Sequence, residues 1–303
     1  MMTDLMTMVP ENLNRLRILV DEKLETLCAE RPSAIPQRLW DSVTYSLLAG
    51  GKRLRPALCI AAAEMLSVKP ERVIPMALAL EMIHTASLIH DDLPAMDNDT
   101  LPRGKPTNHV LFGESLAILA GDALLVWGFS HPLETLLRLG NEPEDVIDAL
   151  SAFADAVGPS GICGGQVLDT DTMSWTEEDG FVREISIRKT AVLIRASVLT
   201  GAILAHGDAT IRKAIGEYGM HLGIAFQIVD DILDVTSSAE ELGKTPGKDA
   251  DQGKKTFVAA YGLDGAKKMA VAESETAISS LSCYGREAWF LRGLAEYLVH
   301  RHH

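Results

Sequence analysis

Along most of the chain, apolar residues recur every three to four positions, and short polar stretches with Gly or Pro separate these runs. That spacing is typical of helices that bury one face, and Pro and Gly mark where such helices end. No segment shows the two-residue alternation of a half-buried strand. The pattern predicts helices over residues 12–30, 37–48, 56–65, 71–90, 114–139, 144–157, 163–171, 177–204, 209–235, 266–281 and 286–300.

Two segments depart from this regular picture. We expect the helix over 114–139 to break near Gly128 and Pro132, and we expect the polar, Gly- and Lys-rich residues 237–256 to form a loop. No shift in composition marks a linker, so residues 1–303 are expected to form a single all-α domain.

Composition narrows the possible functions. The chain has 303 residues, of which 47% are apolar, and a formal net charge of 28 − 42 = −14, which argues against binding nucleic acid. Four scattered cysteines without a CxxC motif suggest a reducing compartment. The first residues lack the basic and apolar regions of a signal peptide, and no uninterrupted stretch reaches membrane-spanning length. We therefore expect a cytoplasmic protein without stable membrane insertion.

Residues 87–109, SLIHDDLPAMDNDTLPRGKPTNH, hold the first concentration of charge. Asp91 and Asp92 follow an apolar helical run, Pro94 disfavours further helix, and Asp97 and Asp99 follow in the loop. Like charges this close repel one another unless cations neutralise them. Carboxylate oxygens, with water and substrate phosphates, are the usual ligands of Mg²⁺.

A single acidic run is more often solvated surface than a metal site, and the Gly and closing Glu of an EF-hand are missing here. However, the pattern recurs 139 residues later in FQIVDDILD, residues 226–234. There Asp230 and Asp234 are four residues apart and are expected to share one helix face. The recurrence favours two facing helices in a bundle, whose core can hold a metal site.

Together with GGKRLRP, RGKPTNH, GGQ, Lys189-Thr190 and GKTPGKD, these motifs resemble those of the trans-isoprenyl diphosphate synthases, which include farnesyl and geranylgeranyl diphosphate synthases. The resemblance covers residues 45–257 in the family's order. It implies an antiparallel helical bundle around a deep central cavity, usually a homodimer. It also implies Mg²⁺-dependent condensation of isopentenyl diphosphate with an allylic diphosphate (dimethylallyl, geranyl or farnesyl).

The resemblance also assigns roles to individual residues. The expected metal ligands are Asp91, Asp97 and Asp230, supported by Asp92, Asp231 and Asp234. The residues expected to hold isopentenyl diphosphate are Lys52, Arg55, His84 and Arg103. Lys189, Thr190 and Gln227 are expected beside the developing cation and the allylic diphosphate, and Lys244 and Lys254 over the leaving group. Gly164-Gly165-Gln166 is expected to deform a helix near the cavity, with Asp169 in its polar lining.

Two features bear on activity and product length. The family usually has a pair of arginines after the first Asp motif, whereas this chain has Pro102 before Arg103, so one phosphate contact is expected to be missing. Ala86, followed by Ser87, lies where farnesyl synthases of this type carry an aromatic residue that blocks the growing chain. An alanine there favours a longer product, geranylgeranyl diphosphate.

Three alternatives remain open at this point. A farnesyl synthase differs only in product length. A non-catalytic subunit of a heteromeric synthase is favoured by Pro102 alone, and both Asp motifs argue against it. A terpene cyclase would share the first Asp motif but would need neither GGKRLRP nor a second motif of the DDILD type.

Overall fold

The computed structural model describes residues 2–100, 105–175, 180–236 and 254–300. In these ranges every regular element is a helix, as the sequence predicts. The helices are α1 (Met2–Cys28), α2 (Gln37–Leu47), α3 (Leu54–Met65), α4 (Ile74–Asp91), α5 (Asn108–Phe112), α6 (Glu114–Arg138), α7 (Pro143–Val157), α8 (Ile162–Thr170), α9 (Phe181–Ser186), α10 (Val192–Leu204), α11 (Ala209–Thr236), α14 (Phe257–Ser280) and α15 (Trp289–His300). Short 3₁₀ turns are η1 (Pro70–Arg72), η3 (Thr172–Ser174) and η5 (Arg286–Ala288), and η4 (Ile187–Ala191) is a π-helix.

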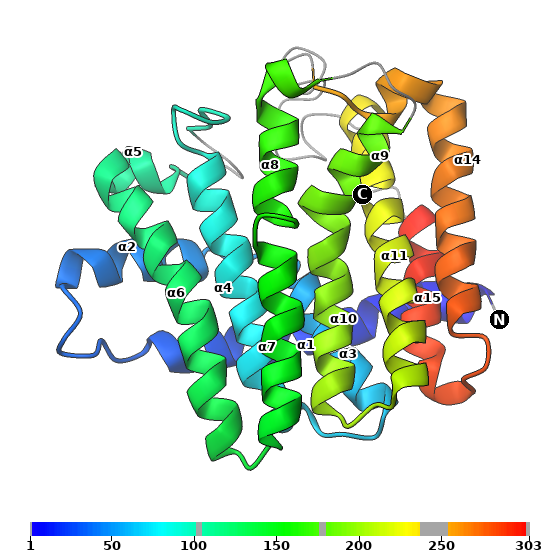
Figure 1. Cartoon of the computed structure of the whole chain (residues 1–303), viewed down its shortest axis with the longest axis horizontal. Coiled ribbons are helices and arrows are strands. Elements are labelled where there is room, and N and C mark those ends of the chain that lie inside the picture. Colours follow the sequence, from blue (N-terminus) through cyan, green and yellow to red (C-terminus); the bar gives the residue numbers. More distant parts are fainter. Residues whose placement is uncertain (1, 101–104, 176–179, 237–253, 301–303) are drawn as a thin grey trace.

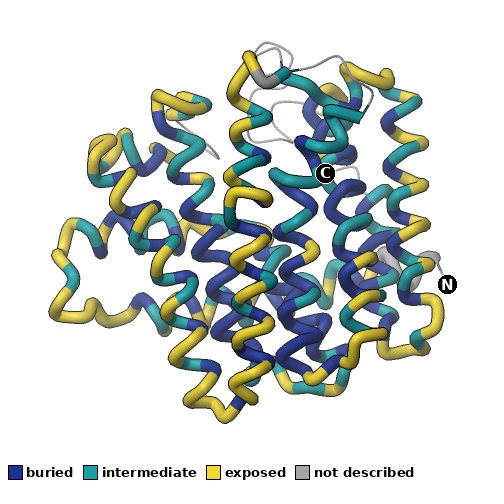
Figure 2. Tube along the Cα trace, in the orientation of Figure 1, coloured by how far each residue is buried: buried dark blue, intermediate teal, exposed yellow. Residues whose placement is uncertain are grey.

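The helices form a single bundle around α10, whose residues are nearly all buried (Figures 1 and 2). It packs against α3, α4, α7 and α11, and α14 covers the other side of α11. This apolar packing is the main source of stability in such a domain. The all-α, single-domain fold predicted from the sequence is confirmed.

Three local predictions were wrong. First, α6 continues without a break through Gly128 and Pro132, and at Gly128 the side chain of Ile83 of α4 packs close to the α6 backbone. Second, residues 181–204 are not one uniform helix, since the π-helical turn η4 separates α9 from α10. Third, α14 begins at Phe257, nine residues before the expected start, with Gly262 at a φ of 71° inside it. The expected loop over 237–256 lies mostly outside the described residues.

Membrane propensity also needs a correction. By length and hydropathy alone, the helix Glu114–Arg138 and the run Pro143–Thr170 are long and apolar enough to cross a membrane. The sequence analysis identified no such segment. Core helices of globular proteins meet the same criterion, so this property does not by itself place the helices in a membrane.

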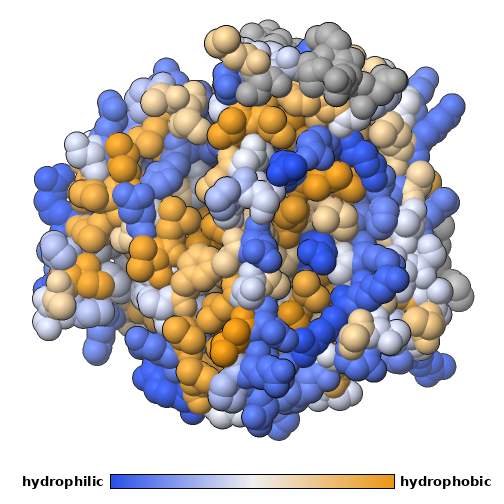
Figure 3. Space-filling view, viewed as in Figure 1, coloured by the Kyte–Doolittle hydropathy of each residue, from blue (hydrophilic) through white to orange (hydrophobic). Residues whose placement is uncertain are grey.

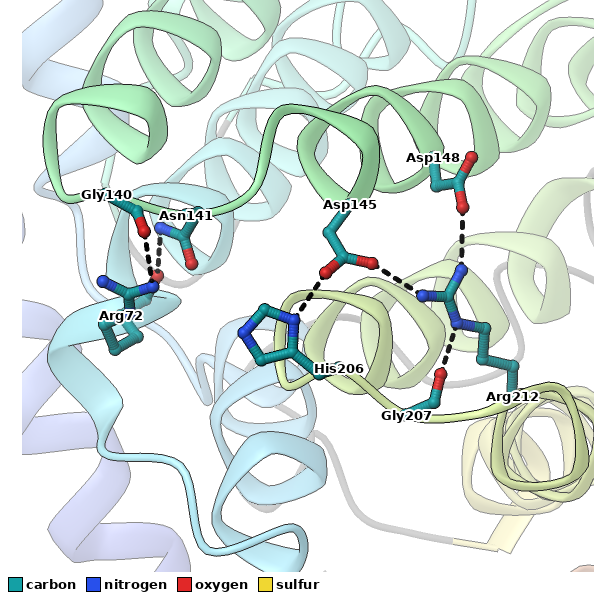
Figure 4. Close-up of polar contacts among 8 residues, drawn as sticks. All are labelled: Arg72, Gly140, Asn141, Asp145, Asp148, His206, Gly207 and Arg212. Atoms are coloured by element: carbon teal, nitrogen blue, oxygen red, sulfur yellow. Dashed lines mark hydrogen bonds and ion pairs between the residues drawn. The ribbon is translucent and has the colours of Figure 1, made fainter.

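The two ends of the bundle differ in character. At the end where α6 turns into α7 and α10 into α11, Asp145 accepts hydrogen bonds from His206 (2.6 Å) and Arg212 (2.7 Å) (Figure 4). Arg212 also binds Asp148 and the Gly207 carbonyl oxygen. These contacts tie the turns together. The C-terminal ends of α4, α8 and α11 lie at the opposite end of the bundle (Figure 1).

Candidate active site

The first Asp motif begins where α4 ends. The last residue of α4 is Asp91, the first aspartate of the motif. The loop that follows folds back, so that the Asp97 amide donates a hydrogen bond of 2.8 Å to the Asp91 carbonyl oxygen. From α8, the Gln166 side chain donates a hydrogen bond of 2.8 Å to the Asp91 carboxylate. Asp92 is half-buried at the end of the same helix. The fold therefore holds Asp91 and Asp97 near each other at this end of the bundle.

The surroundings of Asp91 disfavour its charged form. Burial raises the pKa of this carboxyl to about 6, and the neighbouring Asp97 and Asp169 carboxylates add to that effect. The positive charges of Lys189 and Lys254 act in the opposite direction. Together with Asp91 itself, these groups comprise three carboxyls and two lysines, and a divalent cation would stabilise the charged form of the partly buried Asp91.

The π-helix η4 brings the Lys-Thr pair beside α8. Gly165 has no side chain at the contact, and a Cβ there would overlap the backbone nitrogen of Lys189. This close approach lets Lys189 form an ion pair with Asp169. Single π-helical turns of this kind are frequent at functional sites. The expectation that GGQ accompanies a deformed helix thus has a physical counterpart, although the deformation lies in the neighbouring helix.

Thr190 starts a second set of contacts that reaches the other Asp motif. Its hydroxyl donates a hydrogen bond of 2.7 Å to Gln227 on α11, and Gln227 donates one of 2.9 Å to Asp231. The second oxygen of Asp231 accepts a hydrogen bond of 2.8 Å from the Phe257 amide at the start of α14. Lys189 and Thr190 are adjacent, so the two motifs are connected through η4.

The three aspartates of the second motif differ in exposure. Asp231 and Asp234 are buried, whereas Asp230 is exposed. Asp230 and Asp234 are four residues apart in the continuous helix α11, so they lie on the same side of it, as expected, but Asp234 is covered and Asp230 is not. Asp230 is the aspartate of this motif most accessible to a ligand from outside the chain.

The expected diphosphate-binding groups lie on α3, α4 and the segment before α14. Lys52 is exposed just before α3, while Arg55 and His84 are half-buried. Burial lowers the pKa of the Arg55 guanidinium, an effect that the Glu81 carboxylate opposes. Lys254 lies 3.5 Å from Asp97. The expected site residues Arg103 and Lys244, and Pro102, lie outside the described residues.

The expected chain-length residues lie deeper in the bundle. Ala86 has no exposed surface, and the Ser87 hydroxyl donates a hydrogen bond of 2.9 Å to the His84 carbonyl oxygen. A cavity of about 270 Å³ opens elsewhere, between α1, α3, α11 and α15, with Lys52 and Phe226 in its wall. Ala86 does not line that cavity.

Two residues at the site received only a general role from the sequence. Gln166 binds Asp91 of the first Asp motif, and Asp169 binds Lys189 of the Lys-Thr pair, so both contact other expected site residues directly. They are three residues apart on α8 and thus share one face, a spacing that could have paired them from the sequence. No group of three or more His, Cys, Asp or Glu is close enough to form a ready-made metal site among the described residues.

An all-helical bundle with two Asp motifs at one end, connected through a Lys-Thr pair, defines a narrow class of protein. Residues 36–281 match the model of the polyprenyl synthetase family. The chain belongs to this family, that of the trans-isoprenyl diphosphate synthases, and is therefore a prenyl-transferring enzyme.

Individual relatives agree with this assignment. The chain is 41% identical over 295 residues to a geranylgeranyl diphosphate synthase of Cyanophora paradoxa, covering 96% of this chain and 97% of that protein. Among solved structures, a geranylgeranyl pyrophosphate synthetase from the archaeon Geoglobus acetivorans is 32% identical with a TM-score of 0.84, covering 97% and 99% of the two chains. An FPP/GFPP synthase from Zymomonas mobilis is 34% identical with a TM-score of 0.80, covering 99% and 100%.

Proposed function

We propose that this protein is a Mg²⁺-dependent geranylgeranyl diphosphate synthase that joins isopentenyl diphosphate to an allylic diphosphate (dimethylallyl, geranyl or farnesyl). The observation that carries the proposal is the run of contacts from Asp91 through Gln166, Asp169 and Lys189 to Thr190, Gln227 and Asp231. It joins the two acidic motifs into one site. The class of the relatives supports the same reaction.

The residues of the site fit magnesium ions. Asp91, Asp97 and Asp230 would hold them, with Asp92, Asp231 and Asp234 in support. Burial raises the pKa of Asp91, and a bound cation would favour the charged form of this carboxyl. Bound Mg²⁺ would act as a Lewis acid that neutralises the departing diphosphate.

The remaining site residues have distinct proposed tasks. Lys52, Arg55, His84 and Arg103 would bind isopentenyl diphosphate, since guanidinium groups offer paired donors to phosphate. Lys189, Thr190 and Gln227 would line the allylic side, where the cation develops. Lys244 and Lys254 would cover the leaving diphosphate and help to exclude water, which would otherwise quench the cation. The departing diphosphate would accept the proton that is lost.

Ala86 and its surroundings bear on product length. Ala86 is small where an aromatic residue would block the chain, which supports a twenty-carbon product. Its complete burial means that neighbouring side chains already cover it, which favours the alternative of a farnesyl synthase. For a longer product, side chains next to Ala86 would have to move when the substrate binds.

One incubation series tests these proposals. Purified protein is incubated with Mg²⁺, isopentenyl diphosphate and, separately, each allylic diphosphate, and the dephosphorylated products are sized by chromatography. A geranylgeranyl product supports both the reaction and the reading of Ala86. A farnesyl product keeps the reaction and rejects Ala86 as the open position. No product with any primer would reject autonomous catalysis and favour a regulatory subunit of a heteromeric synthase.

We also propose that the protein is a homodimer and acts in the cytoplasm. Large apolar side chains are exposed on one face of α5, α6 and α7, and apolar residues gather over this region in Figure 3. They are Val110, Leu111, Ile118, Leu119, Val126, Leu133, Leu137 and Ile147. Apolar surface of this extent is typical of interfaces. Val126, which is 70% exposed, is a suitable probe.

Light scattering tests the dimer and fractionation tests the location. The wild type should have twice the chain mass, and Val126→Glu should have the mass of one chain or a raised dissociation constant. A wild-type monomer would reject the dimer. Recovery of the wild type with membranes after cell lysis would instead indicate that this face binds lipid, and recovery in the soluble cytoplasmic fraction would support the proposed location.

A further inference from the structure

Arg53, in the middle of the GGKRLRP motif, connects four parts of the bundle. Its guanidinium donates hydrogen bonds to Asp21 on α1 (2.9 Å), to Glu81 on α4 (2.7 Å) and to the Leu47 carbonyl oxygen at the end of α2 (3.0 Å). Arg53 itself is the residue that precedes α3. The side chains of Arg53 and Glu81 are almost completely buried, at 3% and 6% exposure.

The backbone at this point is also unusual. Arg53 has a φ of 48°, in the left-handed region that few residues other than Gly adopt, and it follows Gly50 and Gly51. A buried charge is costly unless it is paired and hydrogen-bonded, and Arg53 has such partners on three sides. The surrounding contacts therefore fix both the conformation and the direction of the chain where it enters α3.

Arg53 and Glu81 lie close in sequence to the residues expected to bind diphosphate. Arg53 lies between Lys52 and Arg55 in the sequence, and Glu81 is three residues before His84, so Glu81 and His84 lie on one side of α4. The buried ion pair thus joins the segment that carries Lys52 and Arg55 to the helix that carries His84. Asp21 accepts from Arg17 as well, which anchors the same contact to α1.

We propose that Arg53 and Glu81 are positioning residues that set Lys52 and Arg55 in register with His84 for binding isopentenyl diphosphate. Neither residue needs to touch the substrate. The proposal rests on the proposed function, since it assumes that these three groups bind that substrate. A displacement of about 1 Å in such a constellation can lower the rate up to a hundredfold.

A second effect of the pair is electrostatic. The Glu81 carboxylate interacts with the charge of Arg55 as well, and the Nε atom of Arg55 is buried without a hydrogen-bond partner among the described residues. Arg53 occupies an oxygen of Glu81 and balances its charge. Without Arg53, Glu81 would be free to pair with Arg55 and compete with the incoming diphosphate.

The test compares Michaelis constants for the two substrates in variants of the whole enzyme. Arg53→Met should raise KM for isopentenyl diphosphate about tenfold or more and change KM for the allylic diphosphate less than about threefold. Arg53→Lys should lie in between, because lysine keeps the charge without the planar set of donors. Arg53→Met/Glu81→Gln should recover part of the loss, because the competing carboxylate is gone.

The double variant also guards against loss of folding, since removal of both charges is far less damaging than leaving one buried and unpaired. Arg15→Met is the matched control. Arg15 binds Glu64 at 2.6 Å and likewise joins α1 to α3, but in an exposed position, and its KM values should match the wild type. Two results would overturn the proposal. One is an equal change in KM for isopentenyl diphosphate and for the allylic diphosphate, and the other is an unchanged KM for isopentenyl diphosphate in both Arg53→Lys and the folded double variant. Lys52→Ala tests the substrate assignment separately: an unchanged KM for isopentenyl diphosphate would reject the assumed site itself.

Discussion

Gln166 on α8 donates a hydrogen bond of 2.8 Å to the carboxylate of Asp91 at the end of α4. The contact joins two helices that are 75 residues apart in sequence, and it orients the carboxylate that we propose as a metal ligand. Partners of this kind, which hold a ligand in place without touching the metal, often have large effects on metal affinity.

Replacing Gln166 by Leu should therefore raise the Mg²⁺ concentration for half-maximal activity about 10- to 100-fold, because Asp91 would lose its orienting donor. Titration of activity with Mg²⁺ measures this shift. Val167→Ala, an exposed change on the same helix, is the control and should leave the titration unchanged. A wild-type titration for Gln166→Leu would show that the hydrogen bond does not prepare Asp91 for the metal.

Gly165 offers a test of the close approach between α8 and η4. In Gly165→Ala the added methyl would overlap the backbone of Lys189, so η4 must shift and carry Lys189 and Thr190 with it. Overpacking of this kind costs about 1–3 kcal/mol, and we expect kcat to fall at least about tenfold. Thermal unfolding and initial rates measure the two effects.

Gly216→Ala is the matched control for this change. It also lies in a helix, but a Cβ there would only contact the Arg195 side chain at 3.4 Å. It should be neutral, or slightly stabilising because alanine has the higher helix propensity. Activity at the wild-type level in Gly165→Ala would mean that the positions of Lys189 and Thr190 tolerate displacement.

The sequence predicted the helices and the position of both Asp motifs because both depend on local patterns. The spacing of apolar residues indicates the helices, and clustered charge indicates the motifs. The sequence did not predict η4, and the contact that distinguishes this turn is non-local, since Gly165 of α8 closely approaches the backbone of Lys189. The start of α14 also has a non-local contact that sequence spacing does not show: the Phe257 amide donates a hydrogen bond to Asp231, 26 residues earlier.

Burial of charged groups was likewise beyond the reach of sequence spacing. Asp230, Asp231 and Asp234 look alike in FQIVDDILD, and only the packing of other helices on α11 shows that the latter two are buried. Arg53 and Arg55 look equally suited to phosphate, yet Arg53 is engaged by Glu81. The motifs indicated which residues matter, and the tertiary contacts divide them into groups that can meet a ligand and groups that hold others in place.

Ala86→Tyr tests the proposed determinant of product length. Ala86 is fully buried, so the phenol ring must either displace neighbours or project toward the space that the growing chain would use. We expect a shorter main product, together with about 1–3 kcal/mol of lost stability from overpacking. Product sizing and thermal unfolding give the two readouts. An unchanged product distribution in a folded variant would remove Ala86 as the determinant.

Asp230 is exposed and its neighbour Asp231 is buried. Alanine at each position should separate the proposed binding of a metal ion by Asp230 from the structural contacts of Asp231. Asp230→Ala removes an exposed carboxylate and should abolish turnover with little change in the free energy of unfolding. Asp231→Ala leaves the buried Phe257 amide and the Gln227 side chain without their acceptor. It should lower the free energy of unfolding by about 1–3 kcal/mol in addition to impairing activity.

Denaturant unfolding and single-turnover rates with excess Mg²⁺ distinguish the two variants. Near-normal rates in Asp230→Ala would reject Asp230 as a metal ligand. Unchanged stability in Asp231→Ala would mean that water replaces the lost acceptor at the start of α14. The two residues are adjacent on one helix. A lower free energy of unfolding for Asp231→Ala than for Asp230→Ala would therefore arise from the contacts of each side chain and not from its place in the motif.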